Sequence, residues 1–334
     1  MVKSRKINVG ITIGDPNGIG IEIILKSLSN FSLFHECNFI IYASIGLIEK
    51  QKQHFQIETP PLKNINSEED LSENLINVKE VFSNSQFNFG ESDKELSAFG
   101  ILSLKEATKA IKDNKIDVLV TAPLNKDLSY SKSFKYTGHT DFLKDYFNAD
   151  PIMLMISGEL RIALLTDHIP LKNVLDFINK DIVEKKIKVL EKCLLNDFKI
   201  NKPKIAVLAI NPHAGDNGLI GNEDELIIKP VINTFKGNTS SVYGPFSADT
   251  FFTNENYKKY DAIIAAYHDQ GLIPFKTISF GKGVNFSVGL SFIRTSPDHG
   301  TAFDIAGKGI ADHTSFINAI KLGIELFKSR NNLV

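Results

Sequence analysis

The chain has 334 residues, of which 43% are hydrophobic and 23% are charged, and this composition is typical of globular proteins rather than of disordered or fibrous ones. Its 38 Lys and Arg residues nearly balance its 39 Asp and Glu residues, and a net charge of −1 provides no broad attraction to nucleic acid or to an anionic membrane. The length predicts about two domains.

The sequence shows no sign of a membrane span or of secretion. No apolar run approaches the ~18 residues that a membrane span needs, and the amino terminus lacks the apolar region and the cleavage site of a signal peptide. The two cysteines, Cys37 and Cys193, form neither a metal-binding pair nor a disulfide framework, so we expect both to be reduced packing residues. We therefore expect a soluble, cytoplasmic protein.

Short apolar runs alternate with segments of helical periodicity along the chain. We expect strands at residues 7–13, 38–43, 116–121, 152–156, 161–166, 204–210 and 261–266, and helices at residues 19–28, 99–114, 181–198 and 223–235. In the helix at 181–198, four apolar residues share one face, as is typical of core packing. Strands separated by helices indicate an α/β protein with a largely parallel sheet.

Residues 50–97 differ from the rest of the chain. They are rich in Asn, Ser, Glu and Lys, contain Pro60 and Pro61, and have weak periodicity. We expect peripheral loops and short elements there, without catalytic residues.

Histidines follow several of the predicted strands. Five of the eight lie in short polar segments, namely His139, His168, His213, His268 and His299. His168, His213 and His268 come directly after strands, and ligands of open α/β sheets bind at the carboxyl ends of strands. Neutral imidazoles suit Zn, Co, Ni or Fe, and nearby carboxylates suit Mg or Mn. We therefore expect these three histidines to form a joint metal site, the alternative being that each only caps a turn or bonds a carbonyl.

Four aspartates near these histidines are candidate ligands or orienting groups: Asp167, Asp216, Asp249 and Asp269.

The loop at residues 14–20 lies between a strand and a helix and contains three glycines, but it matches neither nucleotide-binding glycine motif. Its simplest interpretation is a structural turn with Asp15 or Asn17 capping the helix. In residues 267–306, Lys276 and Arg294 could clamp a phosphate or a carboxylate.

Several motifs, in order from residue 11 to residue 309, point to one family. They are ITIGDPNGIGIE, VTAPLNK, YTGHTDFL, TDHIPL, NPHAGDNGLIGNE, GPFSADTFF, YHDQGLIPFK and GVNFSVGLSFIRTSPDHGTAFDIAGKG. With these motifs the chain resembles the 4-hydroxythreonine-4-phosphate dehydrogenase family of pyridoxal phosphate synthesis, which shares the fold of isocitrate and isopropylmalate dehydrogenases. One departure is Ile21, where the family usually has Pro, and it affects the helix start rather than a reacting group.

The resemblance implies a homodimer in which two α/β domains flank an active-site cleft. The first domain would comprise residues 1–128 and 300–334. The second, residues 129–299, would carry most metal and substrate ligands and the dimer interface. His168, His213 and His268 would bind one divalent ion (Zn, Mg or Co), with one of the three supplied across the interface.

The resemblance also assigns substrate and cofactor contacts. Substrate would be bound by His139, Thr140, Lys276, Asn285 and Arg294. NAD or NADP would lie near Asp298, Gly300 and Thr301, in a fold that does not require GxGxxG. Asp249 and Lys126 are candidates for the proton acceptor by residue type and setting only.

The implied reaction is NAD(P)-dependent oxidation of 4-phosphooxy-L-threonine at its 3-hydroxyl, followed by metal-assisted decarboxylation to 3-amino-2-oxopropyl phosphate. Related dehydrogenases act on 4-phospho-threonate or 4-phospho-erythronate, and the sequence does not decide between these substrates. A metal-dependent hydrolase of a phosphorylated substrate and a non-enzymatic binding module are the alternatives from other classes.

Overall fold

A computed structural model describes residues 5–125, 134–237 and 241–333. The chain forms two compact units, the first of Met1–Ala149 and Leu290–Phe327 and the second of Asp150–Gly289 and Lys328–Val334. The domains expected from the sequence comprise residues 1–128 with 300–334 and residues 129–299. Cys37 and Cys193 are both buried free thiols, as expected, and burial raises the pKa of the Cys193 thiol.

The first unit contains a parallel sheet with strand order β3-β4-β2-β1-β5-β12. Its strands are β1 (Ile7–Thr12), β2 (Cys37–Ala43), β3 (Leu62–Ile65), β4 (Ile76–Glu80), β5 (Val118–Thr121) and β12 (Ile293–Pro297). Its helices are α1 (Gly20–Leu28), η1 (Phe31–His35), α2 (Ile45–Phe55), α3 (Lys94–Lys112), α5 (His139–Tyr146) and α10 (Thr314–Arg330).

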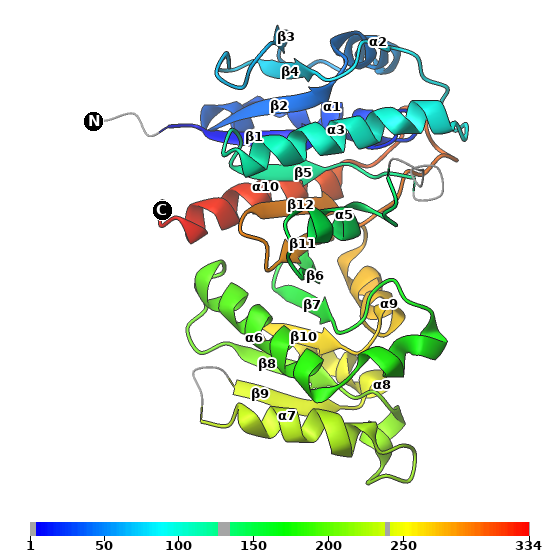
Figure 1. Cartoon of the computed structure of the whole chain (residues 1–334), viewed down its shortest axis with the longest axis vertical. Coiled ribbons are helices and arrows are strands. Elements are labelled where there is room, and N and C mark those ends of the chain that lie inside the picture. The colour runs from blue at the N-terminus through cyan, green and yellow to red at the C-terminus, as the bar shows by residue number, and fades with distance from the viewer. Residues whose placement is uncertain (1–4, 126–133, 238–240, 334) are drawn as a thin grey trace. The chain divides into compact units, whose positions relative to one another are not determined.

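Helices cover both faces of this sheet (Figure 1). α3 packs on β1, β2 and β5 and buries Ile101 and Leu104 against one face. α10 lies on the other face, where a Cβ on Gly323 would come within 2.8 Å of Val118 Cγ1. Strands covered on both faces are buried throughout, which explains their nearly continuous apolar runs.

Residues 50–97 contain short peripheral elements, as expected. β3 and β4 are strands of 4 and 5 residues at one edge of the sheet. α3 begins at Lys94 rather than at residue 99, because the Asp93 carboxylate accepts hydrogen bonds from the amides of Glu95 and Leu96 at 2.8 and 3.1 Å. Such N-capping satisfies amides that have no partner within the helix.

The second unit contains a mixed sheet with strand order β11-β6-β7-β10-β8-β9. Its strands are β6 (Ile152–Ser157), β7 (Leu160–Leu164), β8 (Lys204–Leu208), β9 (Ser241–Phe246), β10 (Ala262–Ala265) and β11 (Val284–Val288). Only β6 is antiparallel to its neighbours, β7 and β11. The helical elements are η2 (Leu171–Phe177), α6 (Lys180–Asn196), η3 (Pro212–Gly215), η4 (Asp224–Ile228), α7 (Lys229–Thr234), α8 (Ala248–Phe251), η5 (Thr253–Lys259) and α9 (His268–Ser279).

Two long helices pack on this second sheet (Figure 1). α6 packs on β6 and β11, and its predicted apolar stripe is buried: Val183, Ile187, Leu190 and Leu194. α9 packs on β6, β7 and β10 and contributes Leu272 and Phe275 to their apolar core. The α/β class with largely parallel strands is thus confirmed.

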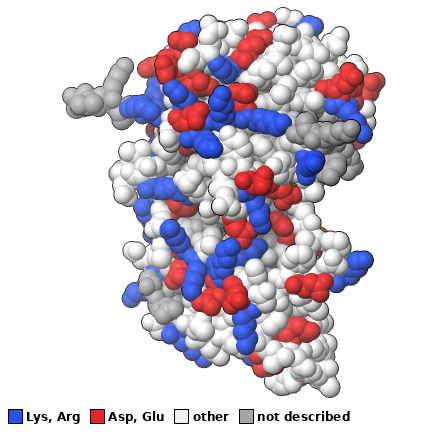
Figure 2. Space-filling model, viewed as in Figure 1, with Lys and Arg blue, Asp and Glu red and all other residues white. Residues whose placement is uncertain are grey.

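The surface has mixed charge on the face that Figure 2 shows, where Lys and Arg side chains are interspersed with Asp and Glu. This agrees with the net charge of −1. Among the helices of the described ranges, none is both long enough and apolar enough to cross a membrane.

Candidate active site

Two of the predicted histidines lie close together in the second unit. β7 and β10 are parallel neighbours, so their carboxyl ends meet at one edge of the sheet. His168 follows β7, His268 is the first residue of α9 after β10, and their ring centroids are 5.6 Å apart. The sheet therefore places two imidazoles side by side.

Asp269 orients the second of these rings. Its Oδ1 lies 2.7 Å from Nδ1 of His268, and a proton on Nδ1 would be donated to this carboxylate. A carboxylate on one ring nitrogen selects the tautomer whose other nitrogen carries the lone pair, which is the arrangement of metal-bound histidines. Asp269 thus fits the orienting role for which the sequence made it a candidate.

His213 lies in a loop with an unusual backbone. Residues 213–218 all have positive φ, from 43° at Asp216 to 93° at Gly218. Non-glycine residues rarely adopt this conformation, because each costs on the order of 1 kcal/mol, and it persists only where neighbouring groups hold it. The loop therefore requires contacts with neighbouring groups that fix its conformation.

The buried carboxylate of Asp224 holds the residues just before this loop in place. It is 0% exposed and accepts hydrogen bonds from the amides of Ile210 and Asn211 at 2.8 and 2.9 Å. Asn211 Nδ2 also donates to it at 3.1 Å. Sequence reasoning missed Asp224, because an acidic residue in a polar helical segment gives no signal that it turns inward.

His213 does not join the histidine pair within one chain. Across residues 5–125, 134–237 and 241–333, no three His, Cys, Asp or Glu side chains are grouped so that they could hold a metal ion. Of the three histidines expected to form one metal site, the described residues bring His168 and His268 together, and His213 stays outside that pair.

Arg294 is the most deeply buried cation predicted to bind substrate. It lies on β12 with 2% exposure, and burial lowers its pKa to about 10, so it remains charged at neutral pH. Its Nε and Nη2 donate to Thr121 Oγ1 on the adjacent strand β5, at 3.2 and 2.6 Å. Thr121, which the sequence analysis did not single out, therefore orients the guanidinium.

The other predicted substrate residues are divided between the units. His139 and Thr140 open α5 in the first unit. In the second unit, Lys276 is exposed in the last turn of α9, and Asn285 lies half-buried on β11.

Of the two candidate proton acceptors, Asp249 is exposed on the short helix α8. Lys126 lies outside the described residues.

The predicted cofactor residues, Asp298, Gly300 and Thr301, lie at the start of the segment 298–313, which connects β12 to α10. The amide of Asp298 donates to Ser315 Oγ at 3.0 Å. The carbonyl of Thr301 accepts from the amide of Ile19 at 3.0 Å, and a Cβ on Gly18 would lie 2.8 Å from the same carbonyl. The glycine loop 14–20 therefore packs directly on this segment, a contact that the sequence did not predict.

The prediction that Asp15 or Asn17 caps α1 is wrong. The N-cap of α1 is Ile19, which makes no side-chain capping bond. Asp15 instead closes the turn by accepting from the amide of Asn17 at 3.0 Å. The side chain of Asn17 bonds the chain at Asn88 and Glu91, at 2.8 and 3.0 Å. Both polar groups are used to join segments rather than to begin the helix.

The sequence matches the family model described as Pyridoxal phosphate biosynthetic protein PdxA over residues 35–323. The chain belongs to this family. It is 37% identical over 332 residues to 4-hydroxythreonine-4-phosphate dehydrogenase of Bacteroides thetaiotaomicron, covering 98% of this chain and 91% of that protein. It is 40% identical over 327 residues to the Sulfurihydrogenibium protein of the same name, covering 97% and 99%.

Solved structures agree with this assignment to the PdxA family. The crystal structure of 4-hydroxythreonine-4-phosphate dehydrogenase from Klebsiella pneumoniae matches with a TM-score of 0.83 and 33% identity, covering 97% of this chain and 98% of that one. Isocitrate dehydrogenase from Methylococcus capsulatus matches with a TM-score of 0.51 and 13% identity, covering 97% and 87%. The latter likeness concerns the fold alone, and it confirms the predicted fold class.

Proposed function

We propose that this chain is a dehydrogenase that oxidises 4-phosphooxy-L-threonine at its 3-hydroxyl with NAD or NADP and releases carbon dioxide, giving 3-amino-2-oxopropyl phosphate for pyridoxal phosphate synthesis. The observation that carries this proposal is similarity over nearly the whole chain to proteins named 4-hydroxythreonine-4-phosphate dehydrogenase. The adjacent imidazoles and the buried guanidinium supply groups suited to such a substrate.

The histidine pair would contribute to a site for one divalent metal ion (Zn, Mg or Co), and of these Mg would depend on oxygen ligands besides the imidazoles. Two neutral imidazoles, one oriented by Asp269, are the donors that Zn²⁺ and Co²⁺ prefer. His168 and His268 would hold the ion together with a third histidine, and in the proposed homodimer one of the three comes from the partner subunit. A bound ion would act as a Lewis acid that acidifies the substrate hydroxyl and stabilises charge during decarboxylation.

Cationic side chains would offset the negative charge of the substrate. Arg294 presents a desolvated guanidinium whose direction is fixed by Thr121, and such a group binds carboxylate or phosphate through two parallel hydrogen bonds. Lys276 offers a second cation on α9. Asn285, His139 and Thr140 would contribute neutral polar contacts.

The cofactor would be bound by the backbone and side chains at Asp298, Gly300 and Thr301. A Cβ on Gly300 would meet no atom within 4 Å, so the backbone there is open to a ligand. Asp249 and Lys126 stay the candidates for accepting the hydroxyl proton.

A substrate panel tests this function. The panel comprises the 4-phosphorylated forms of hydroxythreonine, threonate and erythronate, each with NAD and NADP and with added Zn, Mg or Co. We expect reduced nicotinamide to form fastest with the phosphorylated hydroxythreonine. Release of inorganic phosphate without cofactor reduction would instead identify a hydrolase.

Phosphorylated threonate is the second candidate substrate. The chain is 35% identical over 326 residues to D-threonate 4-phosphate dehydrogenase of Pectobacterium atrosepticum, covering 95% of this chain. That substrate lacks the amino group of the first, so a ratio of kcat/KM values favouring threonate would move the assignment to it.

A further inference from the structure

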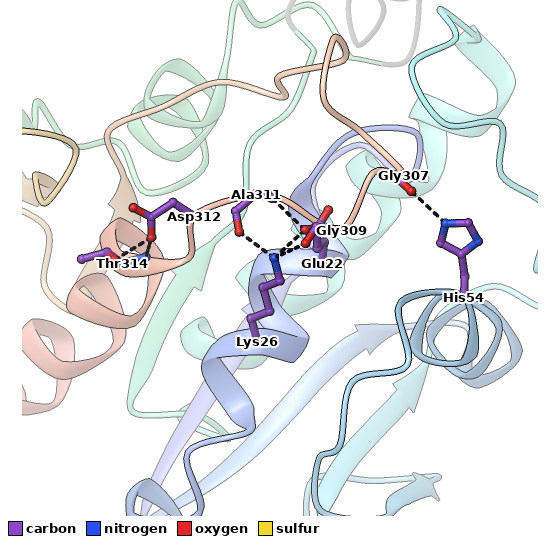
Figure 3. Close-up of polar contacts among 8 residues, drawn as sticks. All are labelled: Glu22, Lys26, His54, Gly307, Gly309, Ala311, Asp312 and Thr314. Carbon is purple, nitrogen blue, oxygen red and sulfur yellow. Dashed lines mark hydrogen bonds and ion pairs between the residues drawn. The ribbon is translucent and has the colours of Figure 1, made fainter.

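Glu22 and Lys26 lie one turn apart on α1 and bind the segment 298–313 (Figure 3). Glu22 is 0% exposed, and its Oε1 accepts from Lys26 Nζ at 2.7 Å and from the amide of Ala311 at 2.9 Å. Lys26 Nζ also donates to the carbonyls of Gly309 and Ala311, at 2.9 and 2.8 Å. Both polar backbone groups of Ala311 are therefore held by this pair.

The chemistry of the pair makes this attachment specific. An ammonium group has three hydrogens, and Lys26 directs them to three acceptors. The carboxylate of Glu22 is buried, and among the described residues its Oε2 has no hydrogen-bond partner. A buried carboxylate depends strongly on its cationic partner, so neither residue can be neutralised alone without a large penalty.

α1 and α2 hold the same segment at other points. The amide of Ile19, just before α1, donates to the carbonyl of Thr301 at 3.0 Å. His54 Nε2 of α2 lies 2.9 Å from the carbonyl of Gly307, whose φ is 79° (Figure 3). The segment is therefore attached where the cofactor is proposed to bind, at Thr301, and also further along at residues 307–311.

These attachments matter because the segment is intrinsically flexible. It contains Gly300, Gly307 and Gly309, and glycine loses more conformational freedom on ordering than any other residue. A loop that is ordered before binding spares the ligand this entropic cost, which otherwise weakens affinity. The hydrogen bonds from α1 restrict the conformations of the segment without help from a ligand.

We propose that Glu22 and Lys26 are positioning residues for the nicotinamide cofactor: they fix the 298–313 segment and thereby set the affinity for NAD(P). This inference rests on the proposed function, in which the segment contacts the cofactor. Both side chains act on the backbone of the segment, so their loss affects cofactor binding rather than the chemical step.

The test replaces both charges together, in Glu22→Gln/Lys26→Met, so that no buried charge is left unpaired. We expect the KM for cofactor and the Kd for NADH or NADPH, whichever the unmodified chain binds more tightly by fluorescence, to rise about 10-fold, with kcat and the KM for substrate changed by less than about twofold. Hydrogen exchange of the amides at residues 309–311 should become faster. Lys26→Arg, which keeps the cation, should stay within about threefold of the unmodified chain.

The matched control is Glu184→Gln/Lys188→Met. This pair has the same spacing on α6, but its side chains are 36% and 60% exposed, and we expect no change in any of these constants. If the double variant at Glu22 and Lys26 does not fold, Glu22→Gln/Lys26→Gln, which leaves no unpaired buried charge and keeps a donor group at residue 26, should show the same split between the two KM values.

Two results would overturn the inference. One is faster exchange at residues 309–311 with an unchanged Kd for NADH or NADPH. The other is a fall in kcat together with a rise in the KM values for both cofactor and substrate, which would indicate that the pair only stabilises the fold. If the unmodified chain bound neither NADH nor NADPH, the proposed function would fail first, and the positioning role would fail with it.

Discussion

The pairing of Arg294 with Thr121 illustrates how much a single hydroxyl can contribute. A guanidinium at 2% exposure has lost its water, so it depends on protein acceptors. Thr121 Oγ1 accepts two of its hydrogen bonds from the neighbouring strand. The hydroxyl therefore stabilises the charge and sets the direction in which the remaining donors point.

Removing that hydroxyl should weaken both stability and substrate binding. For Thr121→Val we expect a loss of about 1–3 kcal/mol in the free energy of unfolding, since the guanidinium loses a buried acceptor. We also expect a higher KM for the phosphorylated substrate. Thr121→Ser keeps the oxygen and should retain most of both properties. Urea denaturation and steady-state kinetics measure the two effects, and equal behaviour of Val and Ser would contradict the orienting role.

Asp15 is a residue whose ionisation opposes folding. Burial raises the pKa of its carboxyl above the ordinary 3.8, and the charge of Asp93 adds to this, while hydrogen bonds from Ser97 and Asn17 act in the opposite direction. A carboxyl with a raised pKa binds its proton more tightly in the folded chain. Its contribution to stability is therefore present at low pH and is lost as the pH rises from 3.8 through the raised folded pKa.

This sign gives a pH-dependent prediction. Asp15→Asn removes the titration, so the variant should gain stability relative to the unmodified chain as the pH rises from about 4 to 7. Urea denaturation of both chains at several pH values measures the difference. A difference that stays constant over this range would show that Asp15 does not titrate differently on folding.

At the scale of elements, the sequence predicts that histidines meet at the carboxyl ends of β7 and β10, but it does not predict the conformation of the loop after β8. Parallel pairing follows from apolar runs separated by helices, so His168 and His268 could be expected to meet from the sequence alone. The conformation around His213 depends on Asp224, and only the folded chain shows that this carboxylate turns inward.

Asp224 should control how well His213 is presented to a metal ion. In Asp224→Asn one oxygen acceptor becomes a donor, so the amides of Ile210 and Asn211 compete for the other. We expect Zn²⁺ or Co²⁺ affinity, measured by calorimetry on the metal-free chain, to fall about 10-fold. Glu225→Gln, on the same short helix but paired with Lys229 rather than with the loop, is the control and should retain affinity. His213→Ala should abolish metal-dependent turnover with the fold intact.

Several elements escaped prediction for identifiable physical reasons. β12 contains Arg294, Thr295 and Ser296, polar residues that are buried in the sheet and hide the apolar signal of a strand. α9 contains Pro274, which usually ends a helix. The antiparallel direction of β6 is not encoded in its apolar run but in the short turn at Gly158 and Glu159, which is too short for a parallel crossover and which the sequence analysis did not use.

At the scale of the whole molecule, the division of the chain into two units depends on contacts between distant segments. Length alone suggested about two domains. The boundary falls within the last turn of α10, so Lys328–Val334 belong to the second unit, and there Arg330 Nε and Nη2 each donate to Asp197 at 2.8 Å. Asp197 is 5% exposed, so its carboxylate is largely removed from water, while the Arg330 side chain is 25% exposed. No local pattern in the sequence announces a pair of residues 133 positions apart.

Breaking this pair should destabilise the second unit. Arg330→Ala leaves the Asp197 carboxylate buried without its cation, and we expect the free energy of unfolding to fall by about 3 kcal/mol. Chemical denaturation measures the change, with the exposed Lys188→Ala as the control. A loss no greater than that of the control would mean that Arg330 is replaceable.

The reversed direction of β6 has a practical consequence. The turn at Gly158 and Glu159 joins β6 to β7, so it lies at the amino end of β7. His168 and His268 follow the carboxyl ends of β7 and β10, at the opposite end of these parallel strands. Glu159 is exposed, while the only native thiols, Cys37 and Cys193, are buried. A Glu159→Cys substitution would therefore offer a single accessible thiol for attaching a fluorophore, at a position remote from the histidine pair.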